Sequence, residues 1–181
     1  MALPKFKYHP DPMATGSVTK SRTKCVCCGK VRGYIYVGPV YAADEYDECI
    51  CPWCIGDGSA HKKLDAEFTD DAGIGDDGRW GKVSQRVIDE VTCRTPGFNS
   101  WQGERWWTHC RDAAQFLGSV GKKELNLLGP PAIAAIRDSA EQMEEPEWNR
   151  LFAALRKNGS PTAYLFRCAK CGKYGGYYEY D

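Results

Sequence analysis

Three Cys-x-x-Cys pairs constrain this chain more than any other feature. The first two are Cys25/Cys28 and Cys51/Cys54. Zn²⁺ prefers four tetrahedral ligands, and two residues between cysteines let both sulfurs reach one ion from a tight turn. Gly29 follows the first pair and can adopt the positive φ of such a turn. The two pairs therefore predict one closed, structural zinc site in a treble-clef-like or zinc-ribbon-like region.

Redox chemistry is the main alternative for the Cys51/Cys54 pair. Glutaredoxin-like enzymes place a Cys-Pro-aromatic-Cys pair at a helix N-terminus, where the thiolate is stabilised. That function needs a βαβ context, which the sequence does not show, and it leaves Cys25 and Cys28 without a role. Zinc is therefore favoured, with the neighbouring cysteines expected to be small packed thiols: Cys27 and Cys49.

The third pair, Cys168/Cys171, is a second zinc-knuckle turn without a partner pair. The best source of further ligands is the segment that ends in His109 and Cys110, although adjacent ligands need an unusual turn. Cys93 is the alternative fourth ligand. We predict a second zinc site formed by His109, Cys110, Cys168 and Cys171.

Two alternatives to a closed second site stay open. In one, the turn holds two free cysteines and His109 packs against its neighbours. In the other, an open fourth position makes the zinc catalytic, with Glu104 or Asp112 as general base. The chain has no H-E-x-x-H, P-loop, nucleotide-binding glycine motif or deaminase pattern, so we expect it not to be an enzyme.

The order of elements predicts an α+β fold. We expect an N-terminal zinc-binding region at 1–81 and a helical region with a C-terminal zinc-knuckle hairpin at 82–181, together forming one compact unit. In the first region we expect a strand at 34–37 in a hairpin between the first two cysteine pairs, a helix at 59–68 with Ser59 as N-cap, and a loop at 70–81. In the second region we expect a helix from Lys82 to the Thr95-Pro96-Gly97 stop and another at 104–117. Pro131 and Pro146 each open a further helix, the second of which stops at Gly159, and strands follow at 162–166 and 174–180.

Charge is distributed unevenly, although the net charge is zero. Residues 1–33 are basic, whereas residues 42–77 hold eleven acids against Lys62 and Lys63. These runs are either two solvated surfaces, which can face each other, or a basic arm and an acidic docking face for a basic partner. The Asp70–Asp77 acids lack EF-hand spacing, so Ca²⁺ is not favoured. The candidate partner-binding residues are Asp44, Glu45, Asp47, Glu48, Asp70, Asp71, Asp76 and Asp77.

The sequence predicts a cytoplasmic protein. The first residues lack the apolar core of a signal peptide, and no stretch approaches the ~18 apolar residues of a membrane span. Thiols stay reduced in the cytosol, where paired cysteines are more often metal ligands than disulfides. No membrane partner is expected.

In order along nearly its whole length, the chain resembles the CbrC family of bacterial proteins. The motifs that carry the resemblance are FKYHPDP (6–12), CVCCG (25–29), YVGP (36–39), CPWCIGDGSA (51–60), RTPGF (94–98), SWQ (100–102), WTHCRD (107–112) and FRCAKCG (166–172). A further cysteine often follows the His-Cys segment in that family, whereas Ala113 and Ala114 stand here. The resemblance implies no enzyme activity and an association with tolerance or immunity to nuclease-type and other polymorphic toxins.

These observations favour a zinc-stabilised immunity protein that binds and neutralises a cognate toxin. An acidic face can plug the basic cleft of a nuclease, with electrostatically steered association. The first alternative is a zinc-ribbon-like nucleic-acid-binding module that uses the basic arm and tryptophans for stacking. The second alternative is a zinc hydrolase that reverses toxin damage.

Overall fold

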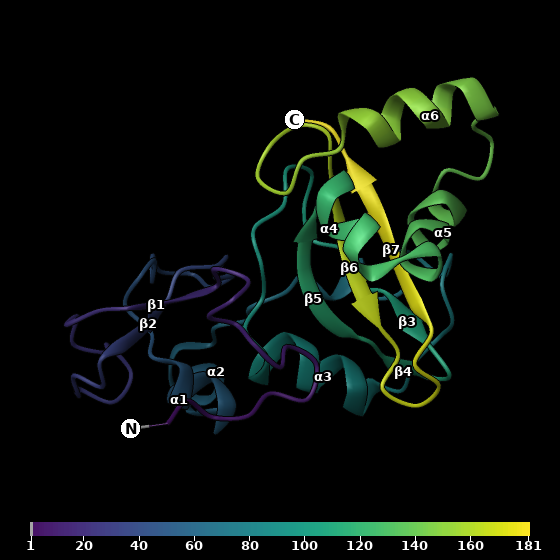
Figure 1. The fold of residues 1–181 in the computed structure, drawn as a ribbon. Helices are drawn as coiled ribbons and strands as arrows, with labels where there is room; N and C mark the ends of the chain where they lie inside the picture. The colour runs from purple at the N-terminus through teal and green to yellow at the C-terminus, as the bar shows by residue number, and fades with distance from the viewer. Residues whose placement is uncertain (1) are drawn as a thin grey trace.

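Three small antiparallel sheets and six α-helices make up the computed structural model, which describes residues 2–181 (Figure 1). The sheets are β1–β2, β3–β4 and β5–β6–β7, and they alternate with helices along the chain. The predicted α+β class is therefore confirmed. A cysteine-rich region at the N-terminus, a helical middle and a C-terminal sheet follow one another in the expected order.

The N-terminal region is built around β1 (Val18–Lys20), β2 (Tyr34–Tyr36), α1 (Pro52–Gly56) and α2 (Ser59–Leu64). The predicted strand at 34–37 exists, but its expected hairpin partner between Cys28 and Cys51 is wrong. β2 pairs instead with β1, which precedes the first cysteine pair. This pairing buries Val18 and Tyr36 together. The Cys25–Cys28 turn, called the first knuckle here, lies in the segment between the two paired strands.

The helix predicted at 59–68 is shorter than expected. Gly58 is its N-cap in place of Ser59, and Asp65 ends it in a left-handed conformation with φ of 51°. The Asp65 N–H then bonds to the His61 carbonyl at 2.8 Å. The residues beyond extend, and Glu67 pairs with Tyr41 in an isolated antiparallel bridge.

The acidic loop at 70–81 is confirmed apart from the short 3₁₀ helix η1 (Asp71–Gly73). It is followed by α3 (Gln85–Arg94), which ends before Pro96 as predicted. Figure 1 places α3 between the N-terminal helices and the C-terminal sheet. Its buried residues are Val91 and Thr92, and the Thr92 carbonyl accepts a 2.7 Å hydrogen bond from the Phe68 N–H.

The helix predicted at 104–117 is wrong. The segment forms β3 (Thr108–His109), β4 (Asp112–Ala113) and β5 (Gln115–Val120). Cys110 and Arg111 both have positive φ, 54° and 57°, and form the turn between β3 and β4, which a continuous helix does not permit. Burial along β5 alternates at its first three residues, so Phe116 is in the core as expected while Leu117 is 38% exposed.

The C-terminal sheet contains the predicted hairpin, with β6 (Thr162–Arg167) paired to β7 (Tyr174–Glu179). β5 joins this hairpin as a third strand, which was not predicted. The covering helices are α4 (Lys122–Leu128), which was not predicted, α5 (Pro130–Ser139) and α6 (Glu145–Ala154). α6 stops at Ala154, earlier than the Gly159 stop that was expected.

The buried side chains form three clusters. One lies in the N-terminal region, one contains Phe98, Trp106, Phe116 and Phe166, and one lies between the sheet and α4–α6. The Phe98 and Phe116 rings stack with centroids 3.8 Å apart. Tyr8 belongs to the second cluster, so the N-terminal segment packs on the C-terminal sheet.

His9 is fully buried beside this second cluster and gives the fold a predicted pH dependence. Its Nδ1–H donates to the Pro96 carbonyl at 2.7 Å, and its Nε2 accepts from the Thr15 hydroxyl at 2.6 Å. Burial lowers the pKa of His9 from 6.5 to about 4. Between these values the unfolded chain binds a proton that the folded chain does not.

We therefore expect the free energy of unfolding to fall as pH drops from about 6.5 to 4, by about 3 kcal/mol in total. Denaturant titrations of the native chain and of His9→Gln across this range isolate the contribution, because protonation of the thiols affects both proteins. If the free energy of unfolding changes with pH in the same way for both proteins, His9 does not make this contribution.

Candidate metal centres

The first two cysteine pairs converge on one point. Cys25 and Cys28 lie on the knuckle turn after β1, while Cys51 and Cys54 lie at the start of α1, where Pro52 opens the helix. The Sγ–Sγ distances are 3.8 Å for Cys25–Cys54, 3.9 Å for Cys28–Cys51 and 3.6 Å for Cys51–Cys54. A tetrahedral ion with Zn–S bonds of about 2.3 Å places its sulfurs about 3.8 Å apart. The cluster therefore fits Zn²⁺ without rearrangement.

In the absence of a cation these thiols compete for protons. A hydrogen bond with Cys51 lowers the pKa of Cys25, and the same bond raises the pKa of Cys51. Burial raises the pKa of Cys54 to about 12. The Cys51 N–H also points at the Cys25 sulfur, 3.3 Å away. A divalent cation would remove this competition, because it stabilises all four thiolates at once.

Both knuckle turns in this chain have the same sequence pattern and the same backbone hydrogen bonds. Each reads Cys-x-x-Cys-Gly-Lys. In the first, Gly29 N–H bonds to Cys25 O at 2.8 Å and Cys25 N–H to Lys30 O at 3.0 Å. In the second, the corresponding distances from Gly172 and Cys168 are 2.9 and 2.8 Å. Both glycines have positive φ, so the glycine after each pair is a requirement of the turn.

The second predicted cluster is also assembled. The β3–β4 turn presents His109 and Cys110 to the β6–β7 turn, which carries Cys168 and Cys171. His109 Nδ1 lies 3.3 Å from the Cys110 sulfur and 3.4 Å from the Cys171 sulfur. A zinc ion bound by nitrogen and sulfur separates those atoms by about 3.6 Å. The positive φ of Cys110 is the unusual turn geometry that adjacent ligands require.

The surroundings orient the second cluster. The His109 ring stacks on Trp107, with centroids 5.1 Å apart and planes 9° from parallel. Burial opposes ionisation of Cys168, but hydrogen bonds from His109 and from backbone amides outweigh it and lower its pKa to about 6. Cys93 does not take part, since it lies in another group with His61 and Glu67. Four donors fill a tetrahedral ion, which is the arrangement of a structural site.

The two carboxylates considered as general bases are engaged elsewhere. Asp112 accepts hydrogen bonds from the Tyr8 hydroxyl at 2.6 Å and from Lys7 at 3.0 Å. Burial opposes ionisation of Asp112, but these bonds outweigh it and lower its pKa. Glu104 accepts from the Tyr41 hydroxyl and from the Asp70 N–H, and burial raises its pKa. Both groups hold segments of the fold together.

Comparison with known proteins identifies the relatives of the chain. Residues 3–180 match the model of the uncharacterised protein family UPF0167. The chain belongs to this family. It is 46% identical over 181 residues to UPF0167 proteins Mb2317 of Mycobacterium bovis and MT2352 of Mycobacterium tuberculosis, covering 98% of this chain and 94% of each relative. It is 42% identical over 180 residues to UPF0167 protein PA1536 of Pseudomonas aeruginosa, covering 99% and 97%. No solved structure matches the chain.

The acidic candidates of this UPF0167 protein lie in two loops. Asp44, Glu45, Asp47 and Glu48 are exposed in the turn between β2 and α1, defined here as the acidic turn. None of the four forms an ion pair with any residue in 2–181. The second loop differs: Asp70 caps η1, and Asp76 lies 3.5 Å from Arg79 and 3.7 Å from Arg105. Asp71 and Asp77 are exposed. The free negative charge is therefore concentrated in the acidic turn.

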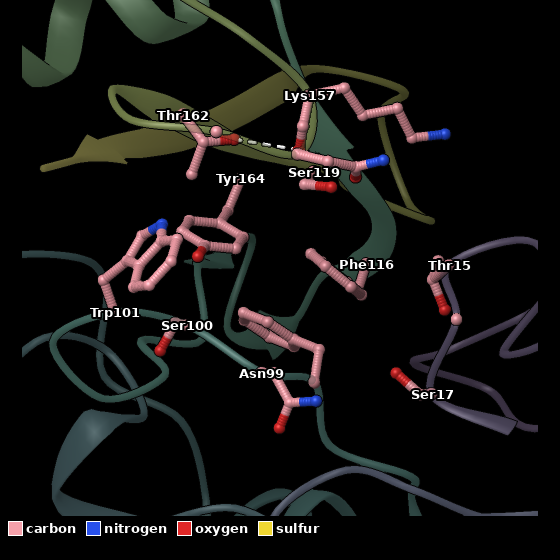
Figure 2. A pocket seen from close by; sticks show the side chains of 14 residues that line it. Thr15, Ser17, Asn99, Ser100, Trp101, Phe116, Ser119, Lys157, Thr162 and Tyr164 are labelled. Atoms are coloured by element: carbon pink, nitrogen blue, oxygen red, sulfur yellow. Dashed lines mark hydrogen bonds between the residues drawn. The ribbon is translucent and has the colours of Figure 1, made fainter. Parts of the chain in front are cut away.

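A pocket of about 360 Å³, lined by both polar and aromatic side chains, was not predicted in this UPF0167 protein (Figure 2). It lies between the N-terminal segment, the loop at 98–101, β5 and the loop after α6. Because these segments are far apart in the sequence, no local motif predicts the pocket. Ser17, Ser100, Ser119 and Lys157 line it, with Phe116 among its aromatic residues. The lining offers hydrogen bonds and one cation, but no carboxylate, thiol or imidazole.

No helix within residues 2–181 is long and apolar enough to cross a membrane.

Proposed function

We propose that both cysteine-rich clusters hold structural Zn²⁺ and that this protein is an immunity protein that binds and neutralises a basic, nuclease-type toxin. The observation that carries the proposal is the acidic turn, whose four carboxylates are exposed and free of cationic partners within residues 2–181. No lysine or arginine occurs between Arg32 and Lys62. The turn therefore presents an uncompensated negative field to an approaching cationic surface.

The first cluster holds the acidic turn in place. The turn ends at Cys49, whose carbonyl accepts a 2.9 Å hydrogen bond from the Val26 N–H of the knuckle, and Cys51 is a ligand candidate directly after it. The Ile50 carbonyl accepts a further bond from the Tyr36 N–H of β2. A preorganised turn loses little conformational entropy on binding, which favours tight association.

Apolar side chains beside the acidic turn can supply affinity. Val26 is 49% exposed on the knuckle that contacts Cys49, and Tyr41 is 40% exposed just before the turn. Aromatic side chains are enriched at protein interfaces, and carboxylates at the rim of an interface steer association. The resemblance to the CbrC family supports the choice of a toxin as partner.

The test is binding to a toxin domain encoded beside this protein, measured by surface plasmon resonance and by rescue of toxin-expressing cells. We expect Glu45→Lys/Asp47→Lys to weaken binding by about 10- to 100-fold, mainly through a slower association rate. Neither side chain forms a hydrogen bond or an ion pair recorded in the structure, so the fold should persist.

The matched control is Asp138→Lys/Glu147→Lys, which reverses two exposed charges on α5 and α6, and it should bind as the native chain does. Equal binding by both double variants would contradict a role for the acidic turn. Absence of a complex together with absence of rescue would contradict the immunity function. Steeply salt-dependent binding to RNA or DNA would favour the nucleic-acid alternative instead.

A further inference from the structure

A third group of metal-binding side chains lies away from the two cysteine-rich clusters. His61 is on α2, Glu67 is in the bridge to Tyr41, and Cys93 is on the last turn of α3. One ligand atom from each lies within 4.8 Å of the other two. Cys93 was predicted only as an alternative ligand for the second site, and no sequence motif connects these three residues.

The backbone fixes the three positions independently. The Asp65 N–H bonds to the His61 carbonyl, which ends α2 just after the histidine. Glu67 exchanges hydrogen bonds of 2.8 and 2.9 Å with Tyr41. The Phe68 N–H bonds to the Thr92 carbonyl at 2.7 Å, which holds the segment of Glu67 beside the end of α3. The grouping therefore results from secondary structure rather than from long, mobile side chains.

His61 supplies an independent sign of an absent ligand. Its Nδ1 is shielded from solvent and has no hydrogen-bond partner among residues 2–181. A buried imidazole nitrogen without a partner is unfavourable, and a coordinate bond to a cation would satisfy it. The two other donors of the group are the nearest candidates to share a cation with it.

The local charge favours a cation. All three residues line one cleft of about 610 Å³, whose wall also contains the carboxylates of Asp71, Asp89 and Glu90. Arg86 and Arg94 also line the cleft, and Arg94 is partly neutralised because it lies 3.5 Å from Glu90 and donates to the Gly56 carbonyl. A divalent cation would relieve the repulsion between thiolate and carboxylate.

We infer that His61, Glu67 and Cys93 form a third metal site for Zn²⁺ or a chemically similar ion such as Co²⁺. Imidazole, carboxylate and thiolate are the donor types that these borderline ions accept. Three protein ligands leave one of four tetrahedral positions open, and it faces the cleft that the ligands line. This site differs from the two closed clusters in having room for water or another small ligand on the ion.

The site would also join two parts of the fold. His61 and Glu67 belong to the region whose core contains Ala60 and Phe68, whereas Cys93 follows Val91, which is in the core of the C-terminal sheet. An ion bound here would link α2 to α3 across their contact. This inference does not depend on the immunity function, since it concerns metal content and stability alone.

The test is a Co²⁺ titration of the full chain after it has been loaded with two equivalents of Zn²⁺. Zn²⁺ binds thiolate-rich sites more tightly than Co²⁺, so the cysteine-rich clusters should stay filled with zinc. We expect one further equivalent of Co²⁺ with a sulfur-to-cobalt charge-transfer band and a rise in melting temperature. Cys93→Ser should abolish the band, and His61→Gln should weaken binding of the third equivalent by about 10- to 100-fold.

The matched control is Cys49→Ser, which removes a half-buried thiol that belongs to none of the three groups, and it should keep the band. Retention of two zinc ions by Cys93→Ser, together with an unchanged circular dichroism spectrum, shows that the variant is folded. If the native chain binds no third ion, or if the band persists in both Cys93→Ser and His61→Gln, the inference is wrong.

Discussion

Replacing Cys51 by alanine should remove one metal equivalent and unfold the N-terminal region. Its sulfur lies 3.9 Å from that of Cys28 and 3.6 Å from that of Cys54, so its loss leaves a three-sulfur group. The first core cluster is assembled around these cysteines. Structural zinc contributes about 10–16 kcal/mol in small motifs, which equals or exceeds the about 5–15 kcal/mol stability of a whole domain. We expect the melting transition of this region to be lost.

Metal analysis by mass spectrometry, thermal unfolding and limited proteolysis measure this effect. Proteolysis should cut Cys51→Ala within residues 1–68 at concentrations that leave the native chain intact. Cys49→Ala is the control from the same segment, and it should retain its metal and resist the protease. Chelation of the native chain should produce the same protease sensitivity within residues 1–68, and readdition of Zn²⁺ should reverse it. A Cys51→Ala protein with full metal content and native protease resistance would refute the structural role.

The substitution Gly175→Ala should destabilise the C-terminal sheet and weaken the second cluster together. A Cβ at this position would overlap the Trp107 ring, which is buried and can shift only by displacing its neighbours. The same ring stacks on His109, so displacing it tilts a candidate ligand. Overpacking of this kind costs about 1–3 kcal/mol, and misorientation of the imidazole lowers metal affinity in addition.

Urea unfolding and competition with a chromophoric chelator measure the two effects of Gly175→Ala. The control is Gly81→Ala, because a Cβ at Gly81 would meet nothing within 4 Å and the residue does not need positive φ. Stability and metal affinity of Gly175→Ala that match those of Gly81→Ala would show that Trp107 does not position His109.

The metal clusters were predictable because their spacing carries geometric information. A Cys-x-x-Cys-Gly turn brings two sulfurs to one ion wherever it occurs, so Cys25/Cys28 and Cys168/Cys171 could be recognised without a fold. The choice of His109 and Cys110 followed from their proximity in sequence to each other and to aromatic residues. The structure brings all eight predicted ligands into the two expected groups.

The helix predicted at 104–117 failed because local composition does not reveal backbone conformation at a turn. Trp107, Ala114 and Phe116 are as well buried in and beside the strands β3, β4 and β5 as they would be in a helix. The deciding residues are Cys110 and Arg111, whose positive φ is stabilised by the pairing of β3 with β4 and has no signal in the residue types. Long-range strand pairing therefore determined the secondary structure of this segment, and residue propensity did not.

The group of His61, Glu67 and Cys93 could not be predicted for a different reason. His61 and Glu67 are single residues near the end of α2, and the acidic loop and most of α3 separate them from Cys93. No repeated spacing connects the three. They meet because α2 stops at Leu64 and the following segment pairs with the end of α3. A helix that continued to Phe68, as predicted, would have carried Glu67 away from Cys93.

The two knuckle turns are alike in geometry, but the two metal clusters differ in how far apart their ligands lie in the sequence. Cys25 and Cys54 of the first group are 29 positions apart, whereas His109 and Cys171 of the second are 62 apart and are joined through β5, β6 and β7. During synthesis on the ribosome, the first group has its full ligand set long before the C-terminal sheet exists. The second becomes complete only when that sheet has closed, so its occupancy would report whether a newly made molecule has finished folding.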